Sequence, residues 1–268
     1  MPTAGQQETG WSHCEANHLR NMQSEDQSVA SSIAVITVCR NPGALLPRAV
    51  GSVVRLNDPR LRHIVIDGAS TDGTVEYLRA QGQRLHHWIS EPDRGIYDAM
   101  NKGWKAAPEH SYILFLGADD QLLSLPSSQE IATAEESGVG IIFGTTTVGD
   151  VQFRSRWDRG IRFRNTVHHQ SMLIRKSLSP APPFDVRYRV YGDWDFNLRL
   201  WRGGAMATYS SSLKALADPG GASAARPVVE SFLIGSRNGG FGAGVAGVGV
   251  VLYCALRDRF RSRMRARS

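Results

Sequence analysis

The feature that most constrains the fold of this chain is a regular alternation of apolar runs with helix-like segments. Four runs carry the apolar, often β-branched residues of buried strands: Ser32–Cys39, Arg62–Gly68, Leu85–Glu91 and Tyr112–Gly117. The segments between them have apolar residues at helical spacing, and one opens with Ser, Thr and Asp, which cap helices. Strands that alternate with helices form βαβ units, so the sequence predicts an α/β fold with a mostly parallel sheet.

Acidic residues stand at the ends of two of these strands. Asp67 lies next to the end of the second run, and Asp119 and Asp120 follow the fourth. Ligands of open parallel sheets bind outside the carboxyl ends of the strands, so we expect these carboxylates to share one crevice. Asp119 and Asp120 should lie at its rim, unburied, where Mg²⁺ or Mn²⁺ would remove their mutual repulsion. For the pair alone, an ordinary turn is the alternative.

The second half of the chain, residues 126–230, has a looser pattern. Residues 138–157 predict a β-hairpin, and residues 166–176 predict a further strand. Residues 192–204 predict a short helix that begins with Asp193 at its N-cap and ends at two glycines.

Composition indicates a soluble globular protein, with 41% hydrophobic residues in a chain of 268. The three cysteines are scattered without a metal-type spacing, which favours a reduced, cytoplasmic setting. Of the net charge of +6, the segment 257–268 carries most, with six arginines and one aspartate. The basic charge is therefore predicted to be a tail rather than a groove, which speaks against a nucleic-acid binder.

Both ends of the chain are predicted to be appendages. Residues 1–31 are polar, lack the apolar core of a secretory signal, and are predicted to be a disordered extension. Residues 238–256 contain no charge and precede the arginine tail. For residues 231–268 we therefore predict peripheral attachment to an anionic membrane surface rather than a full span. A solvated, disordered end is the alternative.

Five stretches resemble, in the right order, sequence blocks of the family 2 glycosyltransferases, and most closely the bacterial exopolysaccharide (colanic-acid) branch. They are VIDGASTDGT (65–74), EPDRGIYDAMNKG (91–103), FLGADD (115–120), HHQSMLIRK (168–176) and FDVRYRVYGDWDFNLRL (184–200). The resemblance covers about residues 32–225. It implies the GT-A fold, with a Rossmann-like nucleotide-sugar-binding half at 32–125 and a smaller mixed acceptor-side half at 126–230.

The resemblance also implies roles for the matched residues in donor binding. Asp67 would contact the nucleobase, with Asn41, Ser70 and Asp72 in the same pocket. In the next block Arg94 would offset the charge of the diphosphate. Asp98 is a further substrate-binding candidate, placed on the same helix face as Asn101.

For catalysis, the resemblance implies that Asp120 coordinates Mg²⁺ or Mn²⁺ and that Asp119 holds the ribose or assists the metal. His169, next to Gln170, would lie near the acceptor and the leaving diphosphate, although an ordinary hydrogen-bonded strand histidine fits as well. Asp193 matches the acidic general base. Asp195 is the alternative base, and we favour Asp193 because a residue at a helix start points into the crevice.

Two glycines depart from the family pattern. Gly117 stands where many relatives carry an acidic residue or Asn, and Gly192 stands where many carry Glu before the base. The first departure reduces the metal motif to Asp119 and Asp120.

The implied function is an inverting, metal-dependent glycosyltransferase of surface polysaccharide synthesis. It would move a sugar from a nucleotide-diphospho-sugar to a saccharide or lipid-linked acceptor, at the inner face of the plasma membrane. One alternative is a non-catalytic nucleotide-sugar-binding protein of the same fold. Another is a nucleotidyltransferase, although residues 39–50 lack the Gly-rich basic loop that such an enzyme would show after its first strand.

Overall fold

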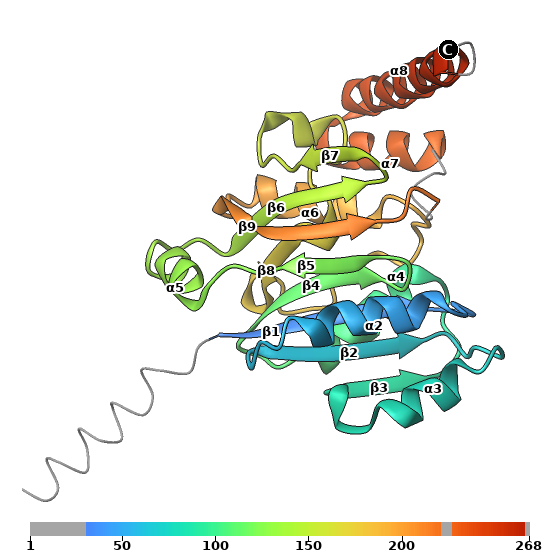
Figure 1. The fold of residues 1–268 in the computed structure, drawn as a ribbon. Coiled ribbons are helices and arrows are strands. Elements are labelled where there is room, and N and C mark those ends of the chain that lie inside the picture. The colour runs from blue at the N-terminus through green and yellow to red at the C-terminus, as the bar shows by residue number, and fades with distance from the viewer. Residues whose placement is uncertain (1–30, 221–226, 266–268) are drawn as a thin grey trace, which may run out of the picture. The chain divides into compact units, whose positions relative to one another are not determined.

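The computed structural model describes residues 31–220 and 227–265. The predicted extension lies outside the described residues, except for Ser31. Four parallel strands form one side of the sheet in the order β3-β2-β1-β4 (Figure 1). Their bounds are β1 (Ser32–Cys39), β2 (Leu61–Asp67), β3 (His87–Ser90) and β4 (Ser111–Gly117). The four predicted strands and their parallel pairing are confirmed.

The sheet continues beyond β4 with mixed pairing in the order β4-β8-β6-β9-β5, and β7 pairs with β6. These strands are β5 (Gln121–Ser124), β6 (Ile141–Val148), β7 (Val151–Arg154), β8 (Met172–Arg175) and β9 (Ala207–Ala217). The β6–β7 hairpin is confirmed. The predicted strand 166–176 is wrong in its first half, because His169–Ser171 form a 3₁₀ turn, η3, and β8 begins at Met172. Since β8 pairs with β4, both halves of the chain share one sheet.

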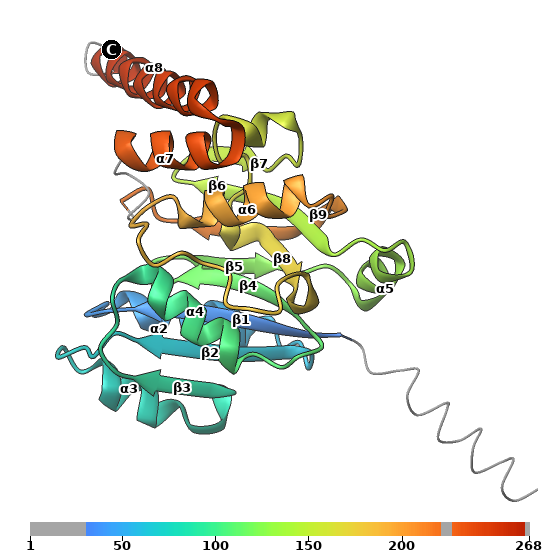
Figure 2. The same ribbon diagram turned by 180° about the vertical axis from the view of Figure 1, so that it is seen from behind.

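Helices cover both faces of the sheet (Figures 1 and 2). Helices α4 and α6 pack on one face and share a core with β1 and β4, while α2 and α5 contribute to the core of the opposite face. The helices of the described chain are α2 (Leu45–Arg55), α3 (Thr74–Gln81), α4 (Ile96–Ala106), α5 (Ser128–Glu136), α6 (Gly192–Arg202), α7 (Val228–Gly239) and α8 (Phe241–Arg265). Glycine is required where α4 crosses β1, because a Cβ at Gly103 would lie 2.3 Å from the Ile36 side chain.

Helices α7 and α8 form a tightly packed pair in the segment for which membrane attachment was predicted. Gly240, with a φ of 80°, separates them. A Cβ at Gly235 would lie 2.6 Å from the Ala243 carbonyl oxygen, and one at Gly244 would lie 2.9 Å from that of Phe232, so both glycines permit the close approach. In the described part of the chain, no helix combines the length and the hydropathy needed to cross a bilayer.

One buried histidine makes the stability of this fold depend on pH. His63 of β2 is 3% exposed, and its Nε2 lies 2.9 Å from the Thr37 hydroxyl. Burial lowers the pKa of His63 to about 4, whereas an unfolded histidine has a pKa of about 6.5. Between these values the unfolded chain binds the extra proton, so stability is complete above about pH 6.5 and falls as the pH drops toward 4.

We therefore expect His63→Gln to flatten the pH dependence of unfolding between pH 6.5 and 4, by up to about 3 kcal/mol. The measurement is the melting temperature as a function of pH. His87→Gln is the matched control, because His87 is exposed on the neighbouring strand. Equal slopes for wild type and His63→Gln would contradict the assignment.

Candidate active site

A cavity of about 230 Å³ opens at the carboxyl end of β4. Its walls come from distant parts of the chain: the start of α4, the turn after β4, the 3₁₀ turn η3, the start of α6 and the end of β9. The side chains that give it chemical character are Tyr97, Asp119, Asp120, His169, Asp193 and Asp218. The structure therefore brings together four of the sequence-predicted residues: Asp119, Asp120, His169 and Asp193.

Asp120 is buried and hydrogen-bonded on both carboxylate oxygens. Its Oδ2 accepts from the Gly117 amide and from Gln170 Nε2, both at 3.0 Å. Its Oδ1 accepts from the Asp218 amide at 3.2 Å. The expectation that this residue lies unburied at the rim is wrong, since it is 4% exposed. Its carboxylate ties the end of β4 to η3 and to the end of β9, which explains why an apolar strand runs into an acidic residue.

Asp119 is the less buried carboxylate of the pair. Burial and the charge of Asp120 raise the pKa of Asp119 above its ordinary value. A cation bound here would relieve that repulsion, so Asp119 fits a role as metal ligand. Within the described residues no group of three or more His, Cys, Asp or Glu side chains is arranged to hold a metal ion. Mg²⁺ is commonly bound through one or two carboxylates, with waters and substrate phosphates as its other ligands.

Asp193 is held in place by three side chains and its own helix. Its Oδ1 accepts from the Trp194 amide at 2.8 Å and from the Tyr97 hydroxyl at 3.3 Å. Its Oδ2 accepts from Asn165 Nδ2 at 2.8 Å and lies 3.5 Å from His169 Nδ1. The predicted N-cap role is wrong, because α6 already begins at Gly192 with Tyr191 as its N-cap. The first-turn position still directs the carboxylate into the cavity, as predicted for a general base.

The two adjacent histidines have opposite environments. Burial lowers the pKa of His168 to about 4, and its ring packs edge-on against Phe153 with centroids 4.4 Å apart. For His169, burial also favours the neutral form, but the hydrogen bond and charge of Asp193 and the charges of Asp120 and Asp119 outweigh it and raise the pKa. Of the two histidines, His169 is therefore the one whose surroundings favour the charged form.

The packing explains both departures from the family pattern. A Cβ at Gly117 would lie 2.5 Å from Asp119 Oδ1 and 2.7 Å from Asp120 Oδ2, so a side chain there would displace both carboxylates. A Cβ at Gly192 would lie 2.8 Å from the Tyr97 ring. Gly192 thus lets Tyr97 approach the base.

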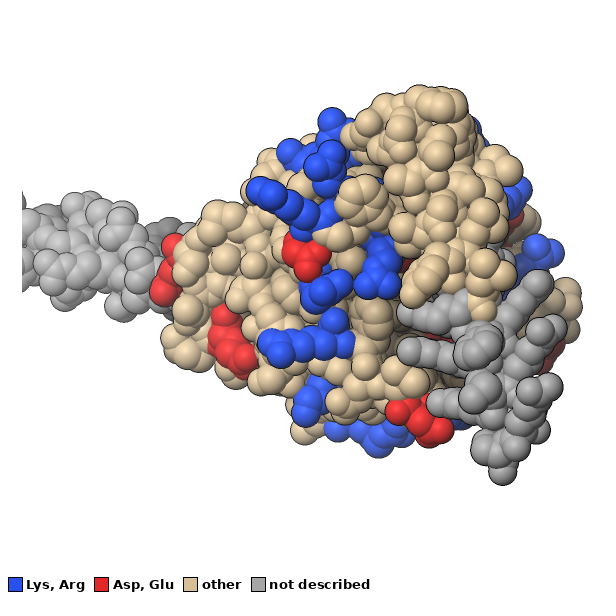
Figure 3. Space-filling view, turned by 90° about the horizontal axis from the view of Figure 1, so that it is seen from above, with Lys and Arg blue, Asp and Glu red and all other residues tan. Residues whose placement is uncertain are grey.

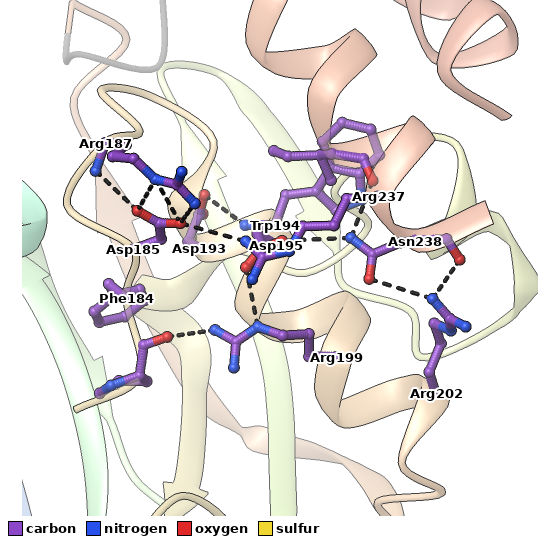
Figure 4. Close-up of polar contacts among 12 residues, drawn as sticks. Phe184, Asp185, Arg187, Asp193, Trp194, Asp195, Arg199, Arg202, Arg237 and Asn238 are labelled. Carbon is purple, nitrogen blue, oxygen red and sulfur yellow. Dashed lines mark hydrogen bonds and ion pairs between the residues drawn. The ribbon is translucent and has the colours of Figure 1, made fainter. Parts of the chain in front are cut away.

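Asp195, the alternative base, lies in a different environment (Figure 4). It is 1% exposed and is not among the residues lining the cavity. Its Oδ2 accepts from Arg199 Nε at 3.0 Å and its Oδ1 from Asn238 Nδ2 at 3.3 Å, which joins α6 to α7. The geometry therefore favours Asp193 as the base and gives Asp195 a structural task.

The predicted nucleotide-binding residues form a second cluster around the turn after β2. Asn41 Oδ1 accepts from the Thr71 amide and Asp72 Oδ2 accepts from the Gly43 amide, which tie the ends of β1 and β2 together. Asp67 is fully buried, and its carboxylate accepts from the Ser70 amide at 3.0 Å and from the Ser90 hydroxyl at 2.6 Å. The Ser70 hydroxyl also bonds to Asp67. Asp67 thus shapes the turn, and its contact with a nucleobase stays a prediction.

The structure does not bring Arg94 or Asp98 into the cavity. Arg94 is exposed and pairs with Asp98 one helical turn away, at 3.1 Å. The guanidinium among the cavity-lining residues belongs instead to Arg189, whose Nη1 donates to the Arg94 carbonyl at 2.8 Å. Arg189 therefore brings to the cavity the kind of positive charge that the sequence analysis expected from Arg94.

Sequence reasoning also missed Glu230 of α7, which holds the loop in front of the base. Its carboxylate accepts from the amides of Arg189, Val190 and Tyr191, at 2.7, 3.0 and 2.9 Å. Tyr97, likewise missed, donates to the Val190 carbonyl at 2.6 Å. Tyr97 lies within the block EPDRGIYDAMNKG, which was the one available signal, whereas nothing in the sequence pointed to Glu230.

Residues 34–193 match the sequence model described as Glycosyl transferase family 2. The chain belongs to glycosyltransferase family 2. This glycosyltransferase is 31% identical over 191 residues to the PGL/p-HBAD biosynthesis glycosyltransferase of Mycobacterium bovis, a match that covers 67% of this chain and 73% of the relative. It is 32% identical over 92 residues to the putative teichuronic acid biosynthesis glycosyltransferase TuaG of Bacillus subtilis, covering 33% and 36%. The family favours sugar transfer over nucleotidyl transfer.

Solved structures confirm the GT-A fold of this glycosyltransferase. TarS 1–349 of S. aureus in complex with UDP-GlcNAc superposes with a TM-score of 0.62 at 15% identity, covering 76% of this chain and 65% of that one. The mannosyltransferase PcManGT of Pyrobaculum calidifontis, in complex with GDP-Man and Mn²⁺, gives 0.54 at 17% identity, covering 92% and 84%. At these identities the likeness concerns the fold alone.

Proposed function

We propose that this family 2 enzyme is an inverting glycosyltransferase that takes a sugar from a nucleotide-diphospho-sugar. The acceptor is a hydroxyl of a saccharide or a lipid-linked saccharide, in the synthesis of a surface polysaccharide or glycolipid. One observation carries the proposal: a single cavity holds Asp193, fixed by Tyr97 and Asn165, together with the Asp119–Asp120 strand end. The nucleoside would lie against the turn of Asp67, Ser70 and Asp72.

In this proposal Asp193 removes the proton from the attacking acceptor hydroxyl, which displaces the nucleoside diphosphate from the opposite face of the anomeric carbon. Such a base contributes about 10²–10⁴-fold to the rate. One displacement inverts the anomeric configuration without a covalent intermediate. Tyr97, whose pKa is raised well above its usual value by burial and by the Asp193 charge, stays a protonated donor that orients the base.

We propose Mg²⁺ or Mn²⁺ as the cofactor, with Asp119 as its principal ligand. Asp120 is the proposed second ligand, and it would exchange one of its hydrogen bonds for the ion. When bound, the ion would supply Lewis-acid stabilisation of the leaving diphosphate. Arg189 supplies further positive charge at the same cavity, and His169 adds to it when it is protonated.

The acceptor and the location of the enzyme are proposed from the relatives and from the C-terminus. The named relatives are glycosyltransferases of PGL/p-HBAD and of teichuronic acid biosynthesis, and for this chain we infer an acceptor held at a membrane. Together with the arginine-rich segment 257–268, this supports a peripheral position on the inner face of the plasma membrane.

Titration calorimetry with a panel of uridine and guanosine diphospho-sugars, with and without Mn²⁺, tests the donor site. We expect one donor to bind, with an affinity that Mn²⁺ raises by about 5- to 150-fold. Asp119→Asn should abolish the Mn²⁺ effect because it removes the ligand charge. Asp150→Asn, an equal charge change at an exposed turn, should not.

Two results would count against parts of the proposal. If Mn²⁺ does not change the affinity for the donor, the proposed metal cofactor is wrong. If no nucleotide sugar binds, the proposed class of donor is wrong. Binding without sugar transfer to any acceptor and without slow donor hydrolysis would favour the non-catalytic nucleotide-sugar-binding alternative.

A further inference from the structure

The α7–α8 pair presents an apolar surface unusual for a water-exposed helix pair. Seven of its described apolar side chains are between 50% and 75% exposed: Val229, Leu233, Phe241, Val245, Leu252, Tyr253 and Leu256. Several large apolar side chains this exposed on one helix pair indicate an interaction surface. The prediction from sequence concerned the uncharged stretch as such, whereas the structure shows which of its side chains face outward.

This helix pair is fixed to the catalytic half rather than attached loosely. Ile234 and Ser231 of α7 are fully buried, and a Cβ at Gly247 of α8 would lie 3.8 Å from the Trp194 ring. Trp194 is the neighbour of the proposed base on α6. The exposed apolar side chains are therefore held at a defined position relative to Asp193.

Beside the helix pair lies an arginine segment, residues 154–164, that the charge count of the whole chain concealed. All five of its arginines are exposed, and Asp158 is its only acidic residue. Arg154 stacks over the Tyr209 ring and Arg156 lies 3.6 Å from Asp158. Arg159, Arg162 and Arg164 form no ion pair with any other described residue. Figure 3 views the molecule from above, the side on which α8 lies in Figure 1, and shows several Lys and Arg side chains on this face.

A groove joins the two features. It has a volume of about 290 Å³ and is lined by Arg162 and Phe163 of the arginine segment, Trp201 and Arg202 of α6, and Asn238 and Ala243 of the helix pair. The guanidinium groups of Arg162 and Arg202 and the exposed Phe163 ring thus meet the α7–α8 pair at this groove. Phospholipid bilayers with anionic headgroups have the complementary chemistry, because basic residues bind the headgroups while apolar residues enter the acyl boundary.

We propose that the α7–α8 pair and the arginine segment 154–164 together form a docking face for anionic phospholipid bilayers. This proposal rests on the proposed function and adds to it, because the docking face would place the start of α6 beside membrane-held acceptors. Its test needs no turnover and no donor, so failure of membrane binding and failure of glycosyl transfer are distinguishable.

The experiment is co-sedimentation of the full chain with vesicles of phosphatidylcholine alone or with added phosphatidylglycerol. We expect binding only to the phosphatidylglycerol vesicles, weakened by salt. The triple variant Arg159→Gln, Arg162→Gln, Arg164→Gln should lower the partition coefficient roughly 100-fold. Leu233→Ser with Val245→Ser should lower it roughly tenfold. Neither variant should change the melting temperature, since all five side chains are exposed.

A matched control is Arg48→Gln, Arg55→Gln, Arg84→Gln, which removes the same charge from exposed positions on α2 and η1 (Gly82–Arg84). It should bind vesicles like wild type. If the segment 154–164 variant binds vesicles as strongly as the wild type, the proposal is overturned. Basic contact with the membrane would then be left to the arginine tail, residues 257–268. If the control variant loses as much vesicle binding as the segment 154–164 variant, the loss reflects only the lower net charge, and the proposal is overturned. Self-association abolished by Leu233→Ser and Val245→Ser, without vesicle binding, would assign the face to a second copy of the chain.

Discussion

Asp193→Asn is expected to lower kcat by about 100- to 10,000-fold while leaving donor affinity and melting temperature close to those of the wild type. The substitution keeps the shape of the side chain and the acceptor oxygen for Asn165 or Tyr97, but it removes the basic carboxylate. Because the loss concerns proton removal in the transition state, it should appear in kcat rather than in KM. The measurement is release of nucleoside diphosphate from the donor that calorimetry identifies, with a saccharide acceptor.

Two further variants separate the base from its surroundings. Tyr97→Phe removes one hydrogen bond to Asp193 and should cost far less activity than Asp193→Asn, since the carboxylate remains. Asn165→Ala, which removes the 2.8 Å bond to Oδ2, should do the same. A kcat loss of less than about tenfold in Asp193→Asn would contradict its role as general base.

The parallel half of the fold was predictable because its information is local. Each of the runs ending at Cys39, Asp67 and Gly117 is apolar enough to specify a buried strand by itself, and βαβ alternation fixes the direction of the next one. The position of Asp119 and Asp120 followed from the same rule, because carboxyl ends of parallel strands meet at one edge.

The surroundings of the site were not predictable, because they depend on contacts between distant segments. Tyr97 reaches Val190 across 93 residues of chain and Asp193 across 96. Glu230 reaches back about 40 residues to the loop before α6. Burial was misjudged for the same reason: Asp120 lies at a strand end, but Gln170 and the Asp218 amide cover it.

The net charge of the chain gave no indication of the basic surface formed by residues 154–164. Outside the arginine tail the chain is nearly neutral as a whole, and the sequence analysis therefore placed the basicity in the tail alone. The five arginines of residues 154–164 are balanced in that sum by carboxylates elsewhere in the fold, such as buried Asp67 and Asp195. A net charge describes the chain, whereas recognition depends on which charges share a face.

Asp195→Ala is expected to destabilise the fold by about 3 kcal/mol, which lowers the melting temperature by roughly 6–12 °C. The carboxylate is 1% exposed and accepts from both Arg199 and Asn238, so its removal takes away the shared acceptor that joins α6 to α7 (Figure 4). The cost stays at the lower end of the range for a broken buried pair, because the Arg199 side chain is 40% exposed and can reach water.

The comparison of Asp193 with Asp195 is the sharpest test of the site, because the two residues lie two positions apart on one helix. Asp193→Asn should lose turnover and keep its melting temperature. Asp195→Ala should lose thermal stability and, at a temperature where it is folded, keep kcat within a few-fold of wild type. The measurements are the melting temperature, by scanning calorimetry, and kcat, by the turnover assay, for each of the two variants. The reverse pattern, with turnover lost only in Asp195→Ala, would transfer the base to Asp195 and make the hydrogen bonds of Asp193 structural.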